Sequence, residues 1–474
     1  MAKIVELPRA KYLQPIDSKE IMGDRERPKV DPETGLPDKL LAYQISEDPR
    51  IMVYPHFFSE AECDHLVGLV EGVWMPSLVG GGEKQPAADQ VKQGQVENYV
   101  GQTRTSWSCM TRYSQTSVLE RLEHRLASIA GLPNGVAQLE RMNMVRYTPG
   151  EFFNEHHDGK FRPLTIFVYL NDLPDDATEG DTFFPILGYS FRPRKGTAIM
   201  WPNTVDGTKE DSRMVHAGRA PSRGVKYGVN CFTNETSMRE LVPIPAEVSL
   251  EDSVVIKVAD LADGPQELGD NGQPILKLYR VVEDPKLVAV PGFMTPAEVQ
   301  HIMDKVRDIK ISPSGPFAKG TQMIHQFEFA ATEEIEAIES RCTAVIGESL
   351  DNLAKLRVVR PGTEFGLCNR GCGKYHIYVC LSEADEVFFP RLGIRFQMVA
   401  GDAISIPNAN FATGMSREEM RTVRVHRFDE SAPVIGLDCY FHDNPLRAQQ
   451  KVRRFRTDAE IAEADRESRL AENN

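Results

Sequence analysis

The sequence lacks a long apolar run and has few cysteines. No stretch of its 474 residues approaches 18 uninterrupted apolar positions, so no membrane-spanning helix is expected. Residues 1–9 also lack the apolar segment of a secretory signal. The eight cysteines are scattered, and without such a signal we interpret them as reduced thiols. These absences predict a cytoplasmic or nuclear protein without disulfides or a membrane anchor.

Metal-binding cysteine clusters and excess positive charge are absent as well. Cys368 and Cys372 form a single C-x3-C pair, and a structural zinc site is not expected because no second pair accompanies it. The 55 Lys and Arg residues are outnumbered by 69 Asp and Glu, which gives a net charge of −14. This balance argues against a nucleic-acid-binding surface.

What the sequence does contain is a repeat. Residues 48–59 recur as residues 284–295, and both segments lead into a helix start with Ala-Glu at matching positions. Further blocks match in the same order: Pro149-Gly150 with Pro361-Gly362, Phe183-Phe184-Pro185 with Phe388-Phe389-Pro390, and residues 196–203 with residues 401–408. Several matched blocks in one order indicate a duplicated domain.

The repeat and the local composition divide the chain into five predicted parts. They are an extended or disordered N-terminal arm (1–45), a first domain (46–236), an acidic linker containing Gly and Pro (237–280), a second domain (281–444) and a charged helical tail (445–474). In the tail we expect the basic residues to form a solvated face.

Helices should come first and strands later in the first domain. Ser59 and Glu62 form a capping-box pattern that predicts a helix start, and a second helix is predicted over 117–130. Short apolar segments between turns follow from Gln138 to Phe232, which is typical of a β-sandwich or barrel. The polar, Gly-rich segment 77–103 is a candidate lid.

One constellation carries chemistry. His156 and Asp158 form a His-x-Asp pattern, and in an extended strand residues two apart point to the same side. His216, much later in the chain, would complete a 2-His-1-carboxylate set, the arrangement that holds Fe(II) in non-haem oxygenases. His157 should face away from the metal.

The surroundings of these residues resemble a known family. The run from Tyr147 to Asp158 is similar to the Y-x-x-G-x-x-Y-x-x-H-x-D pattern of the prolyl 4-hydroxylase family of Fe(II)/2-oxoglutarate dioxygenases. Residues 179–185 resemble that family's G-G-E-T-x-F-P turn, His216 to Lys226 its H-x-G-(x)7-K ending, and residues 104–106 its R-T-S. The resemblance covers about residues 48–235.

The resemblance implies a fold and a set of roles. The fold is α+β, with two double-stranded β-helix (jelly-roll) domains, each with flanking N-terminal helices. Fe(II), 2-oxoglutarate and O2 would take part, with ascorbate as reductant, and Lys226 would pair with the distal carboxylate of 2-oxoglutarate. The implied iron ligands are His156, Asp158 and His216, and the implied cosubstrate residues are Tyr147, Tyr169, Thr182 and Lys226.

The substrate side matches the family only in part. Arg104, Glu140 and Arg162 fall on charged positions that the family associates with substrate. Phe153, Tyr227 and Phe232 replace family residues near the peptide groove, and we expect these positions to influence which C–H bond is reached. A prolyl residue of a peptide or protein is the favoured substrate. A free amino acid or another small molecule is the alternative, and a non-enzymatic double-barrel binding protein is the alternative of another class.

The second copy should be inactive. Aligned through the Pro-Gly pair, His156 falls on Cys368 and Asp158 on Arg370, which cannot ligate a cation. His426 could be the vestige of His216, and no counterpart of Lys226 is evident. We therefore predict a degenerate second barrel that packs on the first domain or recruits a partner.

Overall fold

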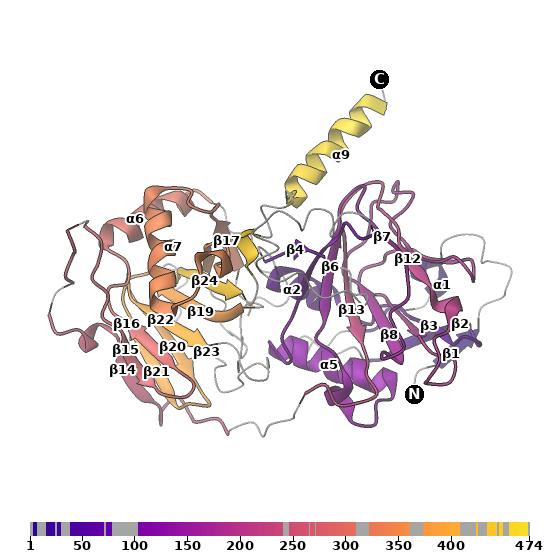
Figure 1. Ribbon diagram of the computed structural model, residues 1–474, viewed down its shortest axis with the longest axis horizontal. Coiled ribbons are helices and arrows are strands. Elements are labelled where there is room, and N and C mark those ends of the chain that lie inside the picture. Colours follow the sequence, from indigo (N-terminus) through magenta and orange to yellow (C-terminus); the bar gives the residue numbers. More distant parts are fainter. Residues whose placement is uncertain are drawn as a thin grey trace. The chain divides into compact units, whose positions relative to one another are not determined.

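The chain divides into two compact units. Unit 1 comprises Met1–Tyr113, Val118–Leu241 and Ala448–Asn474, and unit 2 comprises Ser114–Ser117 and Val242–Arg447. The computed structural model in Figure 1 describes residues 3–6, 16–23, 26–29, 38–70, 73–77, 103–239, 246–264, 266–270, 272–309, 322–360, 373–407, 423–424, 434–442, 445–448 and 455–472. The candidate lid at 77–103 lies almost entirely outside these residues.

Unit 1 contains a large and a small sheet. The large sheet has the strand order β1-β2-β3-β11-β8-β13-β6-β5-β4, and the small sheet has the order β10-β9-β12-β7. Apart from β1, which pairs in parallel with β2, the strands pair antiparallel. The bounds are β1 Lys3–Glu6, β2 Leu41–Ser46, β3 Ile51–Tyr54, β4 Met75–Pro76, β5 Trp107–Met110, β6 Asn143–Tyr147, β7 Phe153–His156, β8 Leu164–Tyr169, β9 Thr182–Phe184, β10 Tyr189–Phe191, β11 Ala198–Pro202, β12 His216–Gly218 and β13 Lys226–Phe232.

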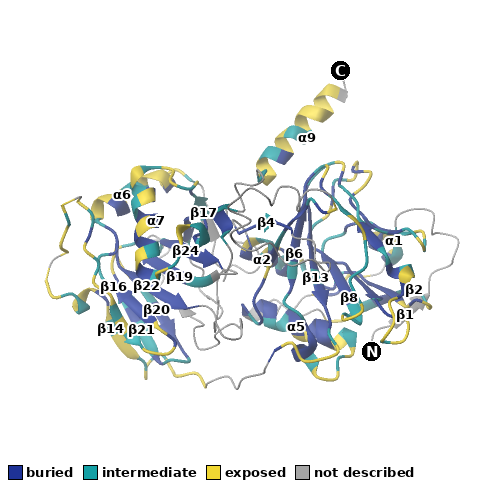
Figure 2. Ribbon diagram, viewed as in Figure 1, coloured by how far each residue is buried: buried dark blue, intermediate teal, exposed yellow. Residues whose placement is uncertain are grey.

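The two sheets of unit 1 share a core. Phe167 and Tyr169 of β8 pack in one cluster with Phe184 of β9 and Phe191 of β10, so inward side chains of both sheets meet. The alternate residues of β8 are buried as well, which means that the large sheet is covered on both faces (Figure 2). This two-layer core explains why the strand segments of the sequence are nearly continuously apolar.

Two helices of unit 1, α2 (Glu60–Leu69) and α5 (Ser117–Ala130), follow the predicted signals. Helix α1 (Ser18–Met22) lies in the expected N-terminal arm, and 3-10 turns lie at Gly135–Gln138 and Ser212–Met214. The capping box of Ser59 and Glu62 is present as predicted. Leu119, Leu122 and Leu126 of α5 form a fully buried apolar stripe.

Parts of the expected N-terminal arm are ordered. Strand β2 begins at Leu41 and pairs with β3, and β1 extends the same sheet. Asp17 caps α1 and forms an ion pair with Arg194. Backbone pairing and a half-buried charge pair hold these segments. Local apolar periodicity cannot reveal either interaction.

Unit 2 also has a large and a small sheet. The orders are β15-β16-β22-β19-β24-β18-β17 and β14-β21-β20-β23. The elements are β14 Val254–Lys257, β15 Tyr279–Val282, β16 Leu287–Val290, α6 Pro296–Val306, β17 Gln322–Gln326, α7 Glu333–Ile346, β18 Arg357–Arg360, β19 Gly373–Cys380, β20 Asp385–Phe389, β21 Ile394–Met398, β22 Ala403–Pro407, β23 Val423–Arg424 and β24 Gly436–His442, with 3-10 turns at Ala259–Leu261 and Leu350–Asn352. Strand β14 lies in the expected linker and pairs in parallel with β21.

The large sheets of the two units are connected in the same way. When the edge strands β1 and β4 are set aside, the remaining strands of the unit 1 sheet, numbered along the chain from β2, and the strands of the unit 2 sheet, numbered from β15, both follow the order 1-2-6-5-7-4-3. Helices α6 and α7 pack on one face of the unit 2 sheet, and its other face packs against the small sheet. The α+β, largely antiparallel architecture agrees with the prediction from sequence. Six described cysteines, Cys63, Cys109, Cys231, Cys342, Cys380 and Cys439, are buried free thiols.

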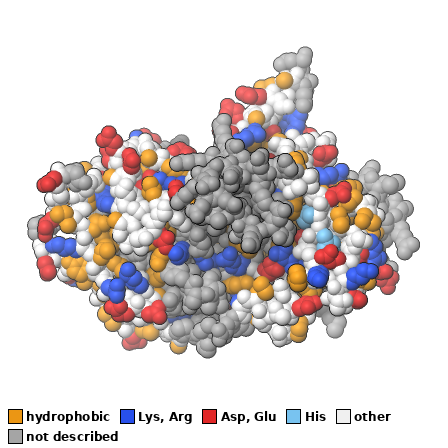
Figure 3. Space-filling model, in the orientation of Figure 1, with side chains coloured by type: hydrophobic (Ala, Val, Ile, Leu, Met, Phe, Trp, Pro, Cys, Tyr) orange, Lys and Arg blue, Asp and Glu red, His pale blue; other side chains and the backbone are white. Residues whose placement is uncertain are grey.

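The C-terminal helix α9 (Asp458–Glu472) belongs to unit 1. Thr457 accepts from the backbone of Glu460, whose carboxylate accepts in return from Thr457, so a capping box starts the helix. Acidic and basic side chains are interspersed over the visible described surface, α9 included (Figure 3). No helix among the described residues is long and apolar enough to cross a membrane.

Candidate metal centre and cosubstrate pocket

Three predicted ligands come together on the small sheet of unit 1. His156 ends β7, His216 begins β12, and the two residues pair directly across these strands. The Asp158 carboxylate lies 3.7 Å from Nε2 of His156 and 3.6 Å from Nε2 of His216. One ligand atom from each residue lies within 4.8 Å of the others, and no other such group occurs among the described residues.

Both imidazoles are oriented for metal binding through Nε2. Nδ1 of His156 donates to the carbonyl of Asn154 at 2.8 Å, and Nδ1 of His216 donates to the carbonyl of Met214 at 2.9 Å. A carbonyl only accepts, so each Nδ1 carries a proton and Nε2 is the nitrogen that remains for a metal. The donor set of two imidazoles and one carboxylate therefore suits Fe(II).

Two residues that the sequence did not identify orient the carboxylate. The Thr165 hydroxyl donates to Asp158 at 2.8 Å, and the Asn203 amide donates to the Thr165 hydroxyl at 2.8 Å. Thr165 and Asn203 are both buried. Their role depends on the packing of β8 beside the loop after β7, which no local pattern in the sequence indicates.

The electrostatics keep the ligands in their metal-binding protonation states. Burial and the neighbouring His216 lower the pKa of His156 to about 3, so this imidazole is neutral at physiological pH. Burial alone would raise the pKa of Asp158, but His216, His156 and the Thr165 hydroxyl hold it below its ordinary value. A neutral histidine and an ionised aspartate are the forms that ligate a cation.

The three ligands and Lys226 line one cavity of about 390 Å³. The Lys226 side chain is almost completely buried, and burial lowers its pKa to about 8. Its ammonium donates to the carbonyl of Asp181 at 3.4 Å. Among the described residues no carboxylate forms an ion pair with it. A buried ammonium without an acidic partner, in the same cavity as a metal-binding triad, fits an anionic ligand.

The other predicted cosubstrate residues surround this lysine. The Lys226 ammonium lies 5.2 Å from the centre of the Tyr147 ring and 5.6 Å from that of Tyr169. The Tyr169 hydroxyl lies 2.7 Å from the Thr182 hydroxyl. Gly228 leaves space for the Phe167 ring beside the strand, because a Cβ there would come within 2.3 Å of it. The structure thus places Tyr147, Thr182 and Lys226 in the wall of the cavity, and Tyr169 contacts Thr182 and Lys226 without lining the cavity itself.

The predicted substrate residues separate into two kinds. Glu140 and Arg162 form a two-pronged ion pair with 2.8 Å hydrogen bonds, so they satisfy each other. Arg104 is buried in the cavity wall, and its Nη2 makes no hydrogen bond to any described part of the chain. Its guanidinium lies 4.4 Å above the ring of Phe153, which is itself stacked on His156 with ring centres 3.5 Å apart.

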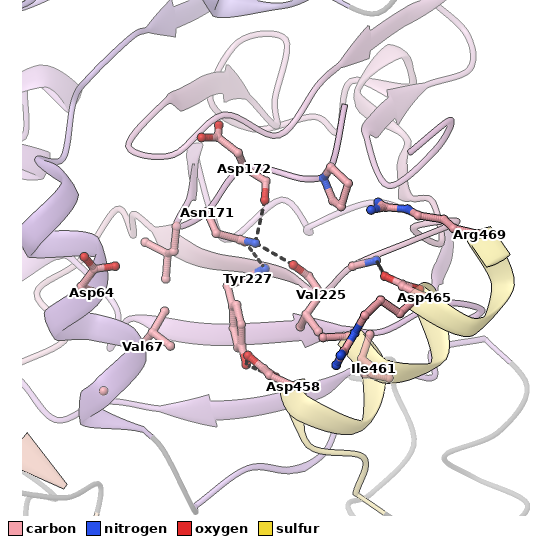
Figure 4. Close-up of a pocket in the computed structure, with 16 residues that line it drawn as sticks. Asp64, Val67, Asn171, Asp172, Val225, Tyr227, Asp458, Ile461, Asp465 and Arg469 are labelled. Carbon is pink, nitrogen blue, oxygen red and sulfur yellow. Dashed lines mark hydrogen bonds between the residues drawn. The ribbon is translucent and has the colours of Figure 1, made fainter. Parts of the chain in front are cut away.

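One expected groove residue lies elsewhere. Phe153 and Phe232 line the cavity, as expected. Tyr227 was expected near the groove, but this is wrong: it follows Lys226 along β13 and therefore points to the opposite face of the sheet. It lines a separate pocket beside α9 (Figure 4). His157 borders the cavity without joining the ligand set.

The second unit cannot be compared ligand by ligand. Cys368, Arg370 and His426, the positions aligned with the three ligands, lie outside the described residues, as does Cys372. The proposed loss of the second site therefore stays a prediction from sequence.

The sequence also matches known proteins. Residues 142–234 match the model of the 2OG-Fe(II) oxygenase superfamily, a stretch that contains the three ligands and Lys226. The chain is 28% identical over 214 residues to "Probable prolyl 4-hydroxylase 7" of Arabidopsis thaliana, which covers 39% of this chain and 62% of that relative. It is also 28% identical over 211 residues to "Prolyl 4-hydroxylase 1" of the same plant, covering 39% and 68%.

Two solved structures resemble part of the chain. A viral collagen prolyl hydroxylase from Paramecium Bursaria Chlorella virus-1, in complex with 2OG, matches with a TM-score of 0.29 and 21% identity, covering 38% of this chain and 94% of that one. A Pseudomonas putida prolyl-4-hydroxylase matches with a TM-score of 0.23 and 17% identity, covering 37% and 98%. The matched part of this chain thus spans 62% of the length of the first relative and nearly all of these smaller proteins.

Proposed function

We propose that the chain is an Fe(II)- and 2-oxoglutarate-dependent dioxygenase, because residues 142–234 match the model of the 2OG-Fe(II) oxygenase superfamily and the chain is similar to prolyl 4-hydroxylases. Its proposed reaction converts a substrate C–H, O2 and 2-oxoglutarate into C–OH, succinate and CO2. The favoured substrate is a prolyl residue in a peptide or protein, in keeping with the names of the relatives. Ascorbate is the expected reductant.

The single observation that carries this proposal is the shared cavity of the triad and Lys226. Iron, with 2-oxoglutarate and O2, supplies the oxidising power when bound. His156, Asp158 and His216 would hold the metal on one face and leave the opposite positions open. Lys226 would pair with the far carboxylate of the cosubstrate, and the buried aromatic rings around it would exclude water from that contact.

Arg104 and Glu140 mark the proposed substrate side. Arg104 lines the cavity, and its Nη2, which makes no hydrogen bond to the described residues, would donate to a carbonyl of the substrate. Glu140 and Arg162 compensate each other's charge, so they are better suited to shape the entrance than to bind an ionic substrate. A neutral peptide group fits this polarity.

Unit 2 is, in this proposal, a degenerate second copy of the double-stranded β-helix. The identical strand orders of the two large sheets support it. Val168 pairs with Ala198 and Val229, and Val379 pairs in the same way with Ala403 and Leu437. Even a close contact repeats, because Gly436 accommodates the Tyr378 ring as Gly228 accommodates Phe167.

The same register indicates what the second copy has lost. Gly436 corresponds to Gly228, so the position of Lys226, two residues earlier, is taken by Val434. Phe388 corresponds to Phe183 and pairs with Val423 as Phe183 pairs with Ala217. The residue before Val423 in sequence, rather than His426, would then correspond to His216. Recruitment of a protein partner by unit 2 remains part of the proposal.

Succinate production tests the proposed function. The full-length protein is incubated with Fe(II), 2-oxoglutarate and ascorbate, with and without a panel of proline-rich peptides and free amino acids. We expect succinate from the wild type, more of it with the correct substrate, and gain of one oxygen atom on that substrate by mass spectrometry. Oxidation of a free amino acid alone would redirect the proposal to small molecules.

A neighbouring histidine offers the matched control. His156→Ala should lose both iron and succinate production, whereas His157→Ala should keep its iron, because only His156 belongs to the ligand set. If the wild type bound no iron and consumed no 2-oxoglutarate, the non-enzymatic binding protein would be the better reading.

A further inference from the structure

The two strands that carry the cosubstrate residues also carry a polar pair on their other face. Strands β6 and β13 place Tyr147 opposite Lys226 and Arg146 opposite Tyr227. Successive residues of a strand point to opposite faces, so Arg146 and Tyr227 stand directly behind the two residues that line the cavity. An interaction that fixes the positions of Arg146 and Tyr227 therefore also fixes the backbone that carries Tyr147 and Lys226.

The C-terminal segment holds the outer pair through Asp458. The Asp458 carboxylate accepts from Nη2 of Arg146 at 2.8 Å and from the hydroxyl of Tyr227 at 2.8 Å. Nε of Arg146 donates to the same hydroxyl at 3.1 Å, which closes a three-membered network. The carbonyl of Arg456 accepts a further bond from Arg146 at 2.6 Å. Figure 4 shows Tyr227 pointing toward Asp458 at the start of α9.

Burial makes this contact consequential. The Arg146 side chain is 0% exposed, and Asp458 is the only carboxylate among the described residues with which it forms an ion pair. Phe455 covers the guanidinium at 4.4 Å and packs edge-on against Trp107. Without Asp458, whose own side chain is 57% exposed, the buried guanidinium would lose its counter-charge and keep only its hydrogen bonds to Tyr227 and to the carbonyl of Arg456.

The helix also holds the start of β13. The Asp465 carboxylate accepts from the backbone N–H of Gly224, two residues before Lys226, at 2.7 Å. Ile461 is buried, whereas most of the following helix is exposed. Arg469 forms an ion pair with Asp176 at 2.9 Å. The contacts of α9 thus concentrate on the strand and turn that present Lys226 to the cavity.

We propose that Asp458 is a positioning residue for the cosubstrate site, acting through Arg146 and Tyr227 on Tyr147 and Lys226. The inference rests on the proposed function. It gives the C-terminal segment 455–472 a role beyond that of a solvated tail. The chain reaches this segment only after unit 2, so the geometry of the cosubstrate site depends on residues that lie beyond the second unit in sequence.

Binding of 2-oxoglutarate is the direct test. Full-length Asp458→Ala, Asp458→Asn and Asp458→Glu proteins are loaded with Mn(II), which is inactive in turnover, and titrated with 2-oxoglutarate by calorimetry. We expect Asp458→Ala to weaken 2-oxoglutarate binding by about tenfold while the affinity for the metal stays unchanged. Asp458→Glu should recover most of the loss, because it restores the counter-charge.

Two further variants separate positioning from general damage. Glu467→Ala removes an exposed carboxylate from the same helix and should bind 2-oxoglutarate like the wild type. In an Arg146→Met background, Asp458→Ala should add little further loss, because the two residues act as one unit. Amide hydrogen exchange should rise in β6 and β13 of Asp458→Ala.

The outcomes distinguish this inference from the proposed function. If the wild type binds no 2-oxoglutarate, the proposed function itself fails. If the wild type binds it and Asp458→Ala binds it equally well, the positioning role is refuted. Equal loss of metal and cosubstrate affinity in Asp458→Ala would reduce Asp458 to a general structural role and would also overturn the inference.

Discussion

The two units of this chain build the same sheet with different interiors. In unit 1 the buried positions Tyr169, Thr182 and Lys226 gather around a cavity. At the positions that correspond by strand register, unit 2 carries Cys380, Val387 and Val434. The apolar residues that join the sheets to each other and to the helices are retained in both.

This difference separates what holds the fold from what performs the chemistry. A core position needs only an apolar side chain of suitable size, so one strand order can hold Tyr169 in unit 1 and Cys380 at the matching register position in unit 2. A metal or an anion needs a particular atom at a particular place. A few substitutions can therefore remove the chemistry while the architecture survives. Four predictions test this contrast.

The largest effect should come from the ligands themselves. His216→Ala removes one of two imidazoles from the triad and should lower iron-dependent succinate production by about a thousandfold or more. Cys368→Ala and Arg370→Ala, at the positions that the proposed duplication aligns with His156 and Asp158, should leave it unchanged. The second measurement is the iron content of each purified variant, determined by elemental mass spectrometry. A comparable loss from Arg370→Ala would show that unit 2 takes part in the chemistry.

Replacing the buried lysine should come next. Lys226→Met makes unit 1 resemble unit 2 at this position and should weaken 2-oxoglutarate binding by about a hundredfold, because a desolvated charge pair is lost. Iron affinity should be retained. The exposed Lys209→Met is the control for loss of a positive charge. If Lys226→Met bound 2-oxoglutarate as tightly as the wild type, Lys226 would not be the partner of the cosubstrate carboxylate.

The same replacement should stabilise the protein without ligand. Burial lowers the folded-state pKa of Lys226 to about 8 from an ordinary 10.5, so the unfolded chain binds the proton more tightly. The buried ammonium therefore lowers the free energy of unfolding. This loss of stability is fully present below about pH 8 and disappears as the pH rises through 10.5. Lys226→Met should therefore gain about 2 to 3 kcal/mol at pH 7 and progressively less toward pH 10.5.

Thermal melts of both proteins across this pH range provide the measurement. The wild type should gain stability relative to Lys226→Met as the pH rises from 8 to 10.5. A constant difference between the two melting temperatures would contradict the assigned pKa, and a less stable Lys226→Met at pH 7 would mean that the ammonium is well compensated.

The smallest effect concerns the support of Asp158. Thr165→Val removes the hydroxyl that donates to this carboxylate and should lower iron affinity by about tenfold. Valine has nearly the same shape, so the core should be preserved. Thr178→Val, at an exposed position of the same unit, is the control. An unchanged affinity in a competition titration with a chelator would show that the hydroxyl only fills space.

Much of the site could be predicted from sequence because its signals are local. The His-x-Asp pattern joins residues two apart at the end of β7 and in the loop that follows it, and the capping box of Ser59 lies within one helical turn. The contact of Asp458 with Arg146 could not be predicted, because it joins residues 312 positions apart through one ion pair. The prediction for Tyr227 was wrong for a related reason. The motif gives the residue type, whereas the alternation of side chains along β13 decides on which face of the sheet Tyr227 lies.

The placement of the site on two sheets has a mechanical consequence. The metal ligands belong to β7 and β12 of the small sheet and the loop after β7, whereas Lys226 belongs to β13 of the large sheet. In the proposed reaction, a cosubstrate bound to the metal at one end and to Lys226 at the other would connect the two layers of the sandwich. Succinate is one carbon shorter than 2-oxoglutarate, so the product would no longer match the distance between the two sheets that the cosubstrate spans.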